Sequence, residues 1–233
     1  MLLYGEKIKK ENDTGGICIM NKLKCRKIIM RIALSGFLGI SMLYHGNTSV
    51  QANSSGEQGN ICKSGYHDFG DKYLRVNNKK KGSKPCFVEN SFGNKQSMVT
   101  GAITAWNSRI AQYGNKSNIS LANITDKNTA KIYIKKAYLG AKMGGLTHLF
   151  SGGKEIVPNP GLSQNYDSVT IQINSQILSN SDVSRVTGHE LGHALGLSHR
   201  LNNRKSIMHN YYEDLETGVA AKIDIETLMH VYR

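Results

Sequence analysis

Apolar residues recur every three or four positions between residues 99 and 110, which is the spacing of an amphipathic helix. The positions are Val99, Ile103, Trp106 and Ile110, and Gly114 follows where this helix is expected to end. A second helix is predicted over residues 224–232, whose apolar side chains share one face: Ile225, Leu228, Met229 and Tyr232. Each helix therefore has one face to bury against a core.

Elsewhere, short runs of β-branched and aromatic residues predict strands. They cover residues 72–76, 86–90, 118–123, 131–136, 144–150 and 168–178. A further helix, capped by Ser181 or Asp182, is expected after the last strand. A helix, several strands and two more helices in this order predict one α+β domain.

Residues 20–52 have the three parts of an export signal. A basic start over residues 22–31 precedes a mostly apolar run over residues 32–44, and Val50-Gln51-Ala52 has the small-x-Ala form that signal peptidase cuts. An uncleaved membrane anchor is the alternative, but the run is short for a membrane span and is broken by Ser35, Gly36 and Gly39. We expect cleavage after Ala52 and a secreted protein.

Residues 1–19 fit no signal-peptide pattern, and we interpret them as an extension that is not normally translated. Thr14-Gly15-Gly16 can be encoded by codons that contain a bacterial ribosome-binding sequence shortly before Met20. This interpretation implies a bacterial origin.

The net charge of +13 falls to +8 without the leader, because eight basic and three acidic residues precede residue 53. Part of the remaining charge lies in a lysine cluster: Lys79, Lys80, Lys81 and Lys84. A solvated basic loop is the simpler interpretation, and adhesion to an anionic cell-surface polymer is the alternative. Scarce aromatic residues and the lack of a recognition helix argue against a nucleic-acid-binding module.

Two of the four cysteines, Cys18 and Cys25, lie before the predicted cleavage point, so the mature chain keeps Cys62 and Cys86. Two thiols in an oxidising compartment predict one disulfide, which would close the loop that carries the lysine cluster.

The sequence HELGHALGLSHR at residues 189–200 carries the strongest chemical signal. His189 and His193 are one helical turn apart, so both imidazoles project from one face and can bind a single zinc ion. Gly196 can adopt the positive φ that ends a helix, which lets the chain bring His199 back as a third ligand. Three histidines leave one position open, as in a catalytic zinc site.

Glu190 follows the first histidine and is the candidate general base. It cannot easily share that coordination position, but it can reach a water bound to the metal. The alternative without a metal is an ordinary helix with histidines on its surface. A structural zinc site is disfavoured, because four protein ligands would normally close it and Glu190 would be unused.

The spacing H-E-x-x-H-x-x-G-x-x-H, followed by Ser206-Ile207-Met208-His209, resembles the metzincin clan of zinc metalloproteases and, within it, the matrixin catalytic domain. The resemblance covers roughly residues 86–232 and implies an α+β fold: a twisted mixed β-sheet with an active-site helix and a C-terminal helix. It also implies that Met208 lies under the histidines as a Met-turn. Three residues similar to the family's edge strand would offer main-chain groups to an extended peptide: Gly145, Leu146 and Thr147.

The sequence departs from the matrixin pattern in three places. Residues 135–145 lack His and Asp, so only His148 remains of the family's second zinc site; we expect one catalytic zinc ion, no structural zinc and no support for calcium. Cys86 lies too close to the first helix for a cysteine-switch propeptide to end there. Asn210 stands where some metzincins have a metal-binding tyrosine, and the nearest tyrosines follow it: Tyr211 and Tyr212.

Together these observations predict a secreted, monomeric zinc endopeptidase, with a polar arm and basic loop over residues 53–85 and a catalytic domain over 86–233. It would hydrolyse extended peptide or protein substrates through a zinc-activated water, with Glu190 as general base. Two alternatives stay open: an exported surface-binding protein with a degenerate protease fold, and a zinc amidase acting on cell-wall peptides.

Overall fold

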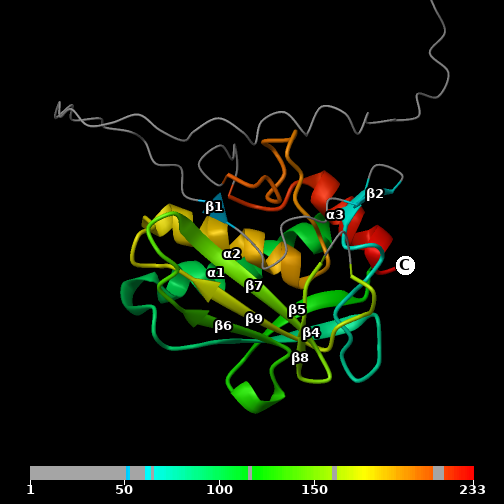
Figure 1. Ribbon diagram of the computed structural model, residues 1–233, viewed down its shortest axis with the longest axis horizontal. Coiled ribbons are helices and arrows are strands. Elements are labelled where there is room, and N and C mark those ends of the chain that lie inside the picture. Colours follow the sequence, from blue (N-terminus) through cyan, green and yellow to red (C-terminus); the bar gives the residue numbers. More distant parts are fainter. Residues whose placement is uncertain (1–50, 53–60, 64–65, 115–116, 159–161, 212–217) are drawn as a thin grey trace, which may run out of the picture. The chain divides into compact units, whose positions relative to one another are not determined.

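The computed structural model describes residues 51–52, 61–63, 66–114, 117–158, 162–211 and 218–233 (Figure 1). The chain divides into Met1–His45 and Gly46–Arg233, and every described residue belongs to the second unit. The predicted extension 1–19, most of the predicted leader and Tyr212 lie outside the described residues. Among the described helices, none is both long and apolar enough to cross a membrane.

A mixed sheet of seven strands forms the centre of the fold. Its order is β1 (Gln51–Ala52), β7 (Met143–Ser151), β9 (Ser168–Ile173), β6 (Ile132–Lys136), β4 (Gly82–Val88) and β5 (Ile119–Ile124), and β8 (Lys154–Ile156) also pairs with β7. The β7 strand runs antiparallel to β9 and β8, whereas β4, β5, β6 and β9 pair in parallel. A separate hairpin joins β2 (Ile61–Lys63) to β3 (Tyr66–Asp68).

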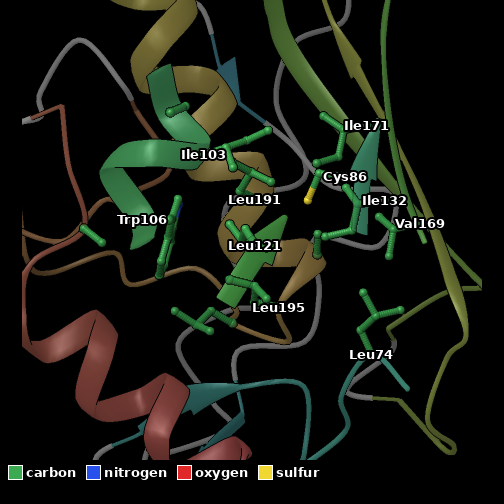
Figure 2. Close-up of a cluster of buried hydrophobic side chains, with 14 of the residues drawn as sticks. Leu74, Cys86, Ile103, Trp106, Leu121, Ile132, Val169, Ile171, Leu191 and Leu195 are labelled. Atoms are coloured by element: carbon green, nitrogen blue, oxygen red, sulfur yellow. The ribbon is translucent and has the colours of Figure 1, made fainter. Parts of the chain in front are cut away.

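Among the described residues, three α-helices accompany the sheet: α1 (Gln96–Tyr113), α2 (Asn180–Ala194) and α3 (Lys222–Val231). Two 3-10 turns, η1 (Gly93–Lys95) and η2 (Lys127–Thr129), complete the described elements. The apolar face predicted for the first helix is confirmed, since Val99, Ile103, Trp106 and Ile110 are all buried. Side chains of α1 and α2 meet those of the sheet in one core (Figure 2), which confirms the predicted α+β architecture with a mixed sheet.

The predicted strand over residues 72–76 is wrong. This segment makes only isolated bridges, Leu74 with Tyr166 and Val76 with Lys79. Asn77 and Asn78 both adopt positive φ, so the chain turns before a ladder can extend. The predicted caps of α2 were placed too late, because Ser179 is the N-cap residue and its side chain accepts a hydrogen bond from the Asp182 amide.

The predicted disulfide between Cys62 and Cys86 is also wrong, because Cys86 carries a free thiol. Cys86 lies on β4 with 0% of its surface exposed and its sulfur near Ile132 and Ile171 (Figure 2). Cys62 belongs to β2, which pairs with β3 rather than with the main sheet. Burial raises the pKa of the Cys86 thiol to about 12, so it behaves as a small core residue.

Lys84 does not belong to a solvated cluster with Lys79 and Lys81. Its side chain is buried, and its ammonium donates to the carbonyls of Leu74 and Lys80, both at 2.8 Å. Burial lowers the pKa of Lys84 to about 8.

Candidate active site

The motif helix α2 ends in a glycine turn that returns the chain toward the helix. The Gly196 amide donates to the His193 carbonyl and the Leu197 amide donates to the Gly192 carbonyl, which is the Schellman pattern. Gly196 has a φ of 98°, and a Cβ there would lie 2.6 Å from the Lys72 carbonyl oxygen. The position therefore needs glycine, as the sequence predicted.

His189, His193 and His199 meet at one point. Their Nε2 atoms are 3.0 Å apart for His189 and His193, 3.1 Å for His189 and His199, and 3.2 Å for His193 and His199. Ligands placed tetrahedrally at about 2.0–2.1 Å from zinc are separated by about 3.3 Å. The three nitrogens therefore have nearly the spacing that a zinc ion requires.

Backbone carbonyls fix the protonation of two of these rings. Nδ1 of His189 lies 2.7 Å from the Ile207 oxygen, and Nδ1 of His193 lies 2.9 Å from the Leu197 oxygen. A carbonyl can only accept, so each Nδ1 must donate and each Nε2 keeps its lone pair. Burial lowers the pKa of His189 to about 3 and that of His193 well below its usual value, so both rings are neutral. Neutral imidazoles with converging lone pairs form a metal-binding set.

Glu190 is buried beside this set, on the turn of α2 that carries His189. The Thr147 hydroxyl donates to its Oε2 at 2.6 Å, whereas Oε1 is buried without a hydrogen-bond partner. Burial raises the pKa of Glu190 well above its usual range, and the Thr147 hydrogen bond partly opposes this shift. A carboxylate with one fixed and one unpartnered oxygen can accept a proton at the unpartnered one.

Met208 lies against the motif helix at Gly192. Its sulfur would be 2.2 Å from a Cβ placed on Gly192, so only glycine allows this approach. Asp224 of α3 holds the turn before Met208: its carboxylate accepts from the Ser206 hydroxyl and from the Ile207 amide, the latter at 2.9 Å. The Ile207 carbonyl is the acceptor for His189, so α3 helps to orient a candidate metal ligand. Sequence reasoning missed Asp224.

The segment after β3 contacts the site from the other side. The Phe69 ring stacks on His193 with centroids 5.8 Å apart, and the Phe69 amide donates to the Gly196 carbonyl. His67 places its Nδ1 3.1 Å from the His199 carbonyl, and the Ser198 amide donates to the His67 carbonyl. Sequence reasoning missed both residues, since nothing in their local pattern marks them.

Gly145, Leu146 and Thr147 lie on β7, next to the motif helix. A Cβ on Gly145 would be 2.7 Å from Oε1 of Glu190, which shows how closely the strand approaches this carboxylate. Tyr211 is 38% exposed, and its ring centroid lies 6.1 Å from that of His209.

Comparisons with known proteins relate the chain to a family of proteases. Two solved structures of myroilysin are similar to the chain: one is 14% identical, with a TM-score of 0.40 and coverage of 71% of this chain and 97% of the other. The second is 16% identical, with a TM-score of 0.37 and coverage of 76% and 99%. No curated protein matches the sequence. The profile of the matrixin family matches residues 91–233, more than half of the chain. The chain therefore belongs to the matrixin family of metalloproteases.

Proposed function

We propose that this protein is an exported zinc-dependent endopeptidase that hydrolyses extended peptides or unfolded proteins, with Glu190 as the general base. The observation that carries the proposal is the triangle of Nε2 atoms, 3.0–3.2 Å apart, next to a buried carboxylate whose Oε1 has no hydrogen-bond partner. Membership of the matrixin family supports the reaction class.

His189, His193 and His199 would hold the metal. A bound zinc ion supplies Lewis-acid chemistry, because it polarises the scissile carbonyl and acidifies the attacking water. Glu190 accepts the proton of that water at Oε1 and returns it to the leaving amine. Thr147 keeps Oε2 occupied, so Oε1 remains the oxygen that exchanges the proton.

The β7 strand would align the substrate. One edge of β7 pairs with β9 along its length. On the other edge, β1 pairs with Met143 and Gly145, and β8 pairs with residues 149–151. No described strand covers the outer edge of residues 146–148, so an extended peptide can add there by main-chain hydrogen bonds. Cleavage after Ala52 would also withdraw β1 from this edge.

The experiment compares Glu190→Gln with the parent on an unstructured protein substrate. The glutamine keeps the size of the side chain but cannot accept the proton, so we expect zinc to stay bound and hydrolysis to fall by at least about 10²-fold. Glu155→Gln is the matched control, since this surface carboxylate lies on β8 and should leave the rate unchanged. A chelator should stop the parent, and added zinc should restore it.

Equal cleavage rates for Glu190→Gln and the parent would refute the role of Glu190. Zinc binding without cleavage of any protein substrate would instead favour one of the two alternatives. Release of peptides from a cell-wall digest would then identify a wall amidase, and its absence would identify a surface-binding protein.

A further inference from the structure

A second group of metal-ligating side chains lies outside the histidine site. Asp68 ends β3, Asp71 lies in the turn that follows, and His230 belongs to the last turn of α3. One ligand atom from each of the three lies within 4.8 Å of the other two. The group joins β3 of the hairpin to the C-terminal helix, because Asp68 belongs to β3 and His230 to α3.

Asp68 makes this group more than a surface ion pair. Only 2% of its surface is exposed, and its Oδ1 already accepts from the amides of Gly70 at 2.7 Å and Asp71 at 2.9 Å. Its Oδ2 is buried and has no hydrogen-bond partner. An unpartnered buried carboxylate oxygen is costly, so this atom points to a ligand that the protein side chains do not supply.

His230 faces the same point in a fixed orientation. Its Nε2 lies 3.0 Å from Oδ1 of Asp71, and its ring stacks on Tyr66 with centroids 4.2 Å apart and planes at 8°. An ion pair would explain the contact between His230 and Asp71. It would leave the buried Oδ2 of Asp68 without a hydrogen-bond partner, whereas a cation between the three side chains satisfies all of them.

We propose that Asp68, Asp71 and His230 bind a second divalent metal ion, with zinc as the best match. Calcium and magnesium prefer sites made of oxygen alone, whereas zinc accepts imidazole nitrogen together with carboxylate oxygen. Tetrahedral zinc ligands are about 3.3 Å apart, which the Asp71 and His230 atoms already approach. The Asp71 side chain is 52% exposed, so its carboxylate has room to move until it and the Asp68 carboxylate can bind the same ion.

The second ion would stabilise the segment that supports the catalytic histidines. Phe69, which packs on His193, lies between Asp68 and Asp71 in the chain. Fixing both carboxylates to α3 therefore holds the Phe69 ring against its partner. The ion is structural in this role, and it touches neither the substrate nor Glu190.

The test counts metal in the full-length protein after saturation with zinc and removal of the excess by dialysis. We expect two zinc ions per chain in the parent and one in the double variant Asp71→Asn with His230→Gln. Glu155→Gln is the matched control, because it breaks another carboxylate–histidine pair, with His148 at 2.7 Å, and should keep two ions. The single variant Asp68→Asn keeps an acceptor for the turn while removing the charge, and should also bind one ion.

Zinc titration during thermal unfolding provides a second readout. Zinc beyond the first equivalent should raise the unfolding temperature of the parent and of Glu155→Gln, but not that of the double variant. One ion in both the parent and the double variant, or two in both, would overturn the second site. One ion in the parent and none in the double variant would keep the second site and overturn zinc binding by the three histidines.

Discussion

Two glycines inside helices should respond in opposite ways to replacement by alanine, and the difference tests the packing of the active site. In a helix interior, alanine is about 0.8–1.0 kcal/mol more favourable than glycine. Gly101 of α1 is exposed, and a Cβ there would meet nothing within 4 Å. Gly101→Ala should therefore stabilise the protein by about 1 kcal/mol.

Gly192 of α2 also lies in a helix, where alanine has the higher helix propensity, but unlike Gly101 it is closely surrounded by side chains. A Cβ there would lie 2.2 Å from the Met208 sulfur and 3.4 Å from Cζ2 of Trp106, where ordinary contacts are about 3.5–4.0 Å. Met208 is 1% exposed, so its sulfur cannot move into solvent. Overpacking of this kind costs about 1–3 kcal/mol, which cancels or exceeds the gain of about 1 kcal/mol in helix propensity.

Gly192→Ala should therefore be less stable than Gly101→Ala by about 1–3 kcal/mol. Urea unfolding of both variants with saturating zinc measures this difference directly. Because Met208 lies under the motif helix, Gly192→Ala should also cleave more slowly, while Gly101→Ala should match the parent. If both alanines stabilised the protein equally, Met208 could not occupy the position described here.

Two further predictions concern buried polar groups. Burial lowers the pKa of Lys84 to about 8, whereas the lysine of the unfolded chain has the usual value of 10.5. Between these two pH values the unfolded state binds more protons than the folded state. The contribution of Lys84 to the free energy of unfolding therefore rises with pH. Urea unfolding at pH 7 and pH 9.5 should show the parent gaining stability relative to Lys84→Met, and an unchanged difference would contradict the burial of a charged amine. Thr147→Val should lower kcat/KM by about tenfold or more with zinc content unchanged, because it removes a hydrogen bond to Glu190, the proposed general base, worth about 1.5–3 kcal/mol. Thr100→Val, whose hydroxyl bonds only to carbonyls of the first turn of α1, should cleave at the parent rate. Equal losses in both variants would show that the effect is not specific to Glu190.

The local parts of the fold could be predicted from the sequence because their causes are local. The helix containing Trp106 follows from apolar spacing, and the strand around Ile171 follows from alternation, since both patterns fix which face is buried. The turn at Gly196 follows from the conformational freedom of one residue. The candidate metal-binding motif is equally local, because His189 and His199 are ten positions apart.

The predictions that were wrong concern groups whose surroundings come from distant parts of the chain. Lysine is rarely fully buried, yet Lys84 finds two carbonyl acceptors and the ring of Tyr232, 5.1 Å away. Cysteine pairing depends on which strands are neighbours, and sequence spacing cannot supply this. The number and spacing of the cysteines do not indicate that Cys86 is buried in the core of the sheet.

The orientation of the catalytic groups is long-range even though the motif is short. The Ile207 carbonyl sets the tautomer of His189, and Asp224 fixes the turn that contains Ile207. The Thr147 hydroxyl, on strand β7, holds the Glu190 carboxylate. A peptide with the motif alone would have the candidate ligands and the proposed base, but nothing to keep Nε2 of His189 unprotonated or to fix one oxygen of the Glu190 carboxylate. The chemistry therefore depends on the sheet and on α3 as much as on the motif. This is why Asp224→Ala on α3 should damage the proposed metal site more than the loss of an exposed lysine such as Lys81.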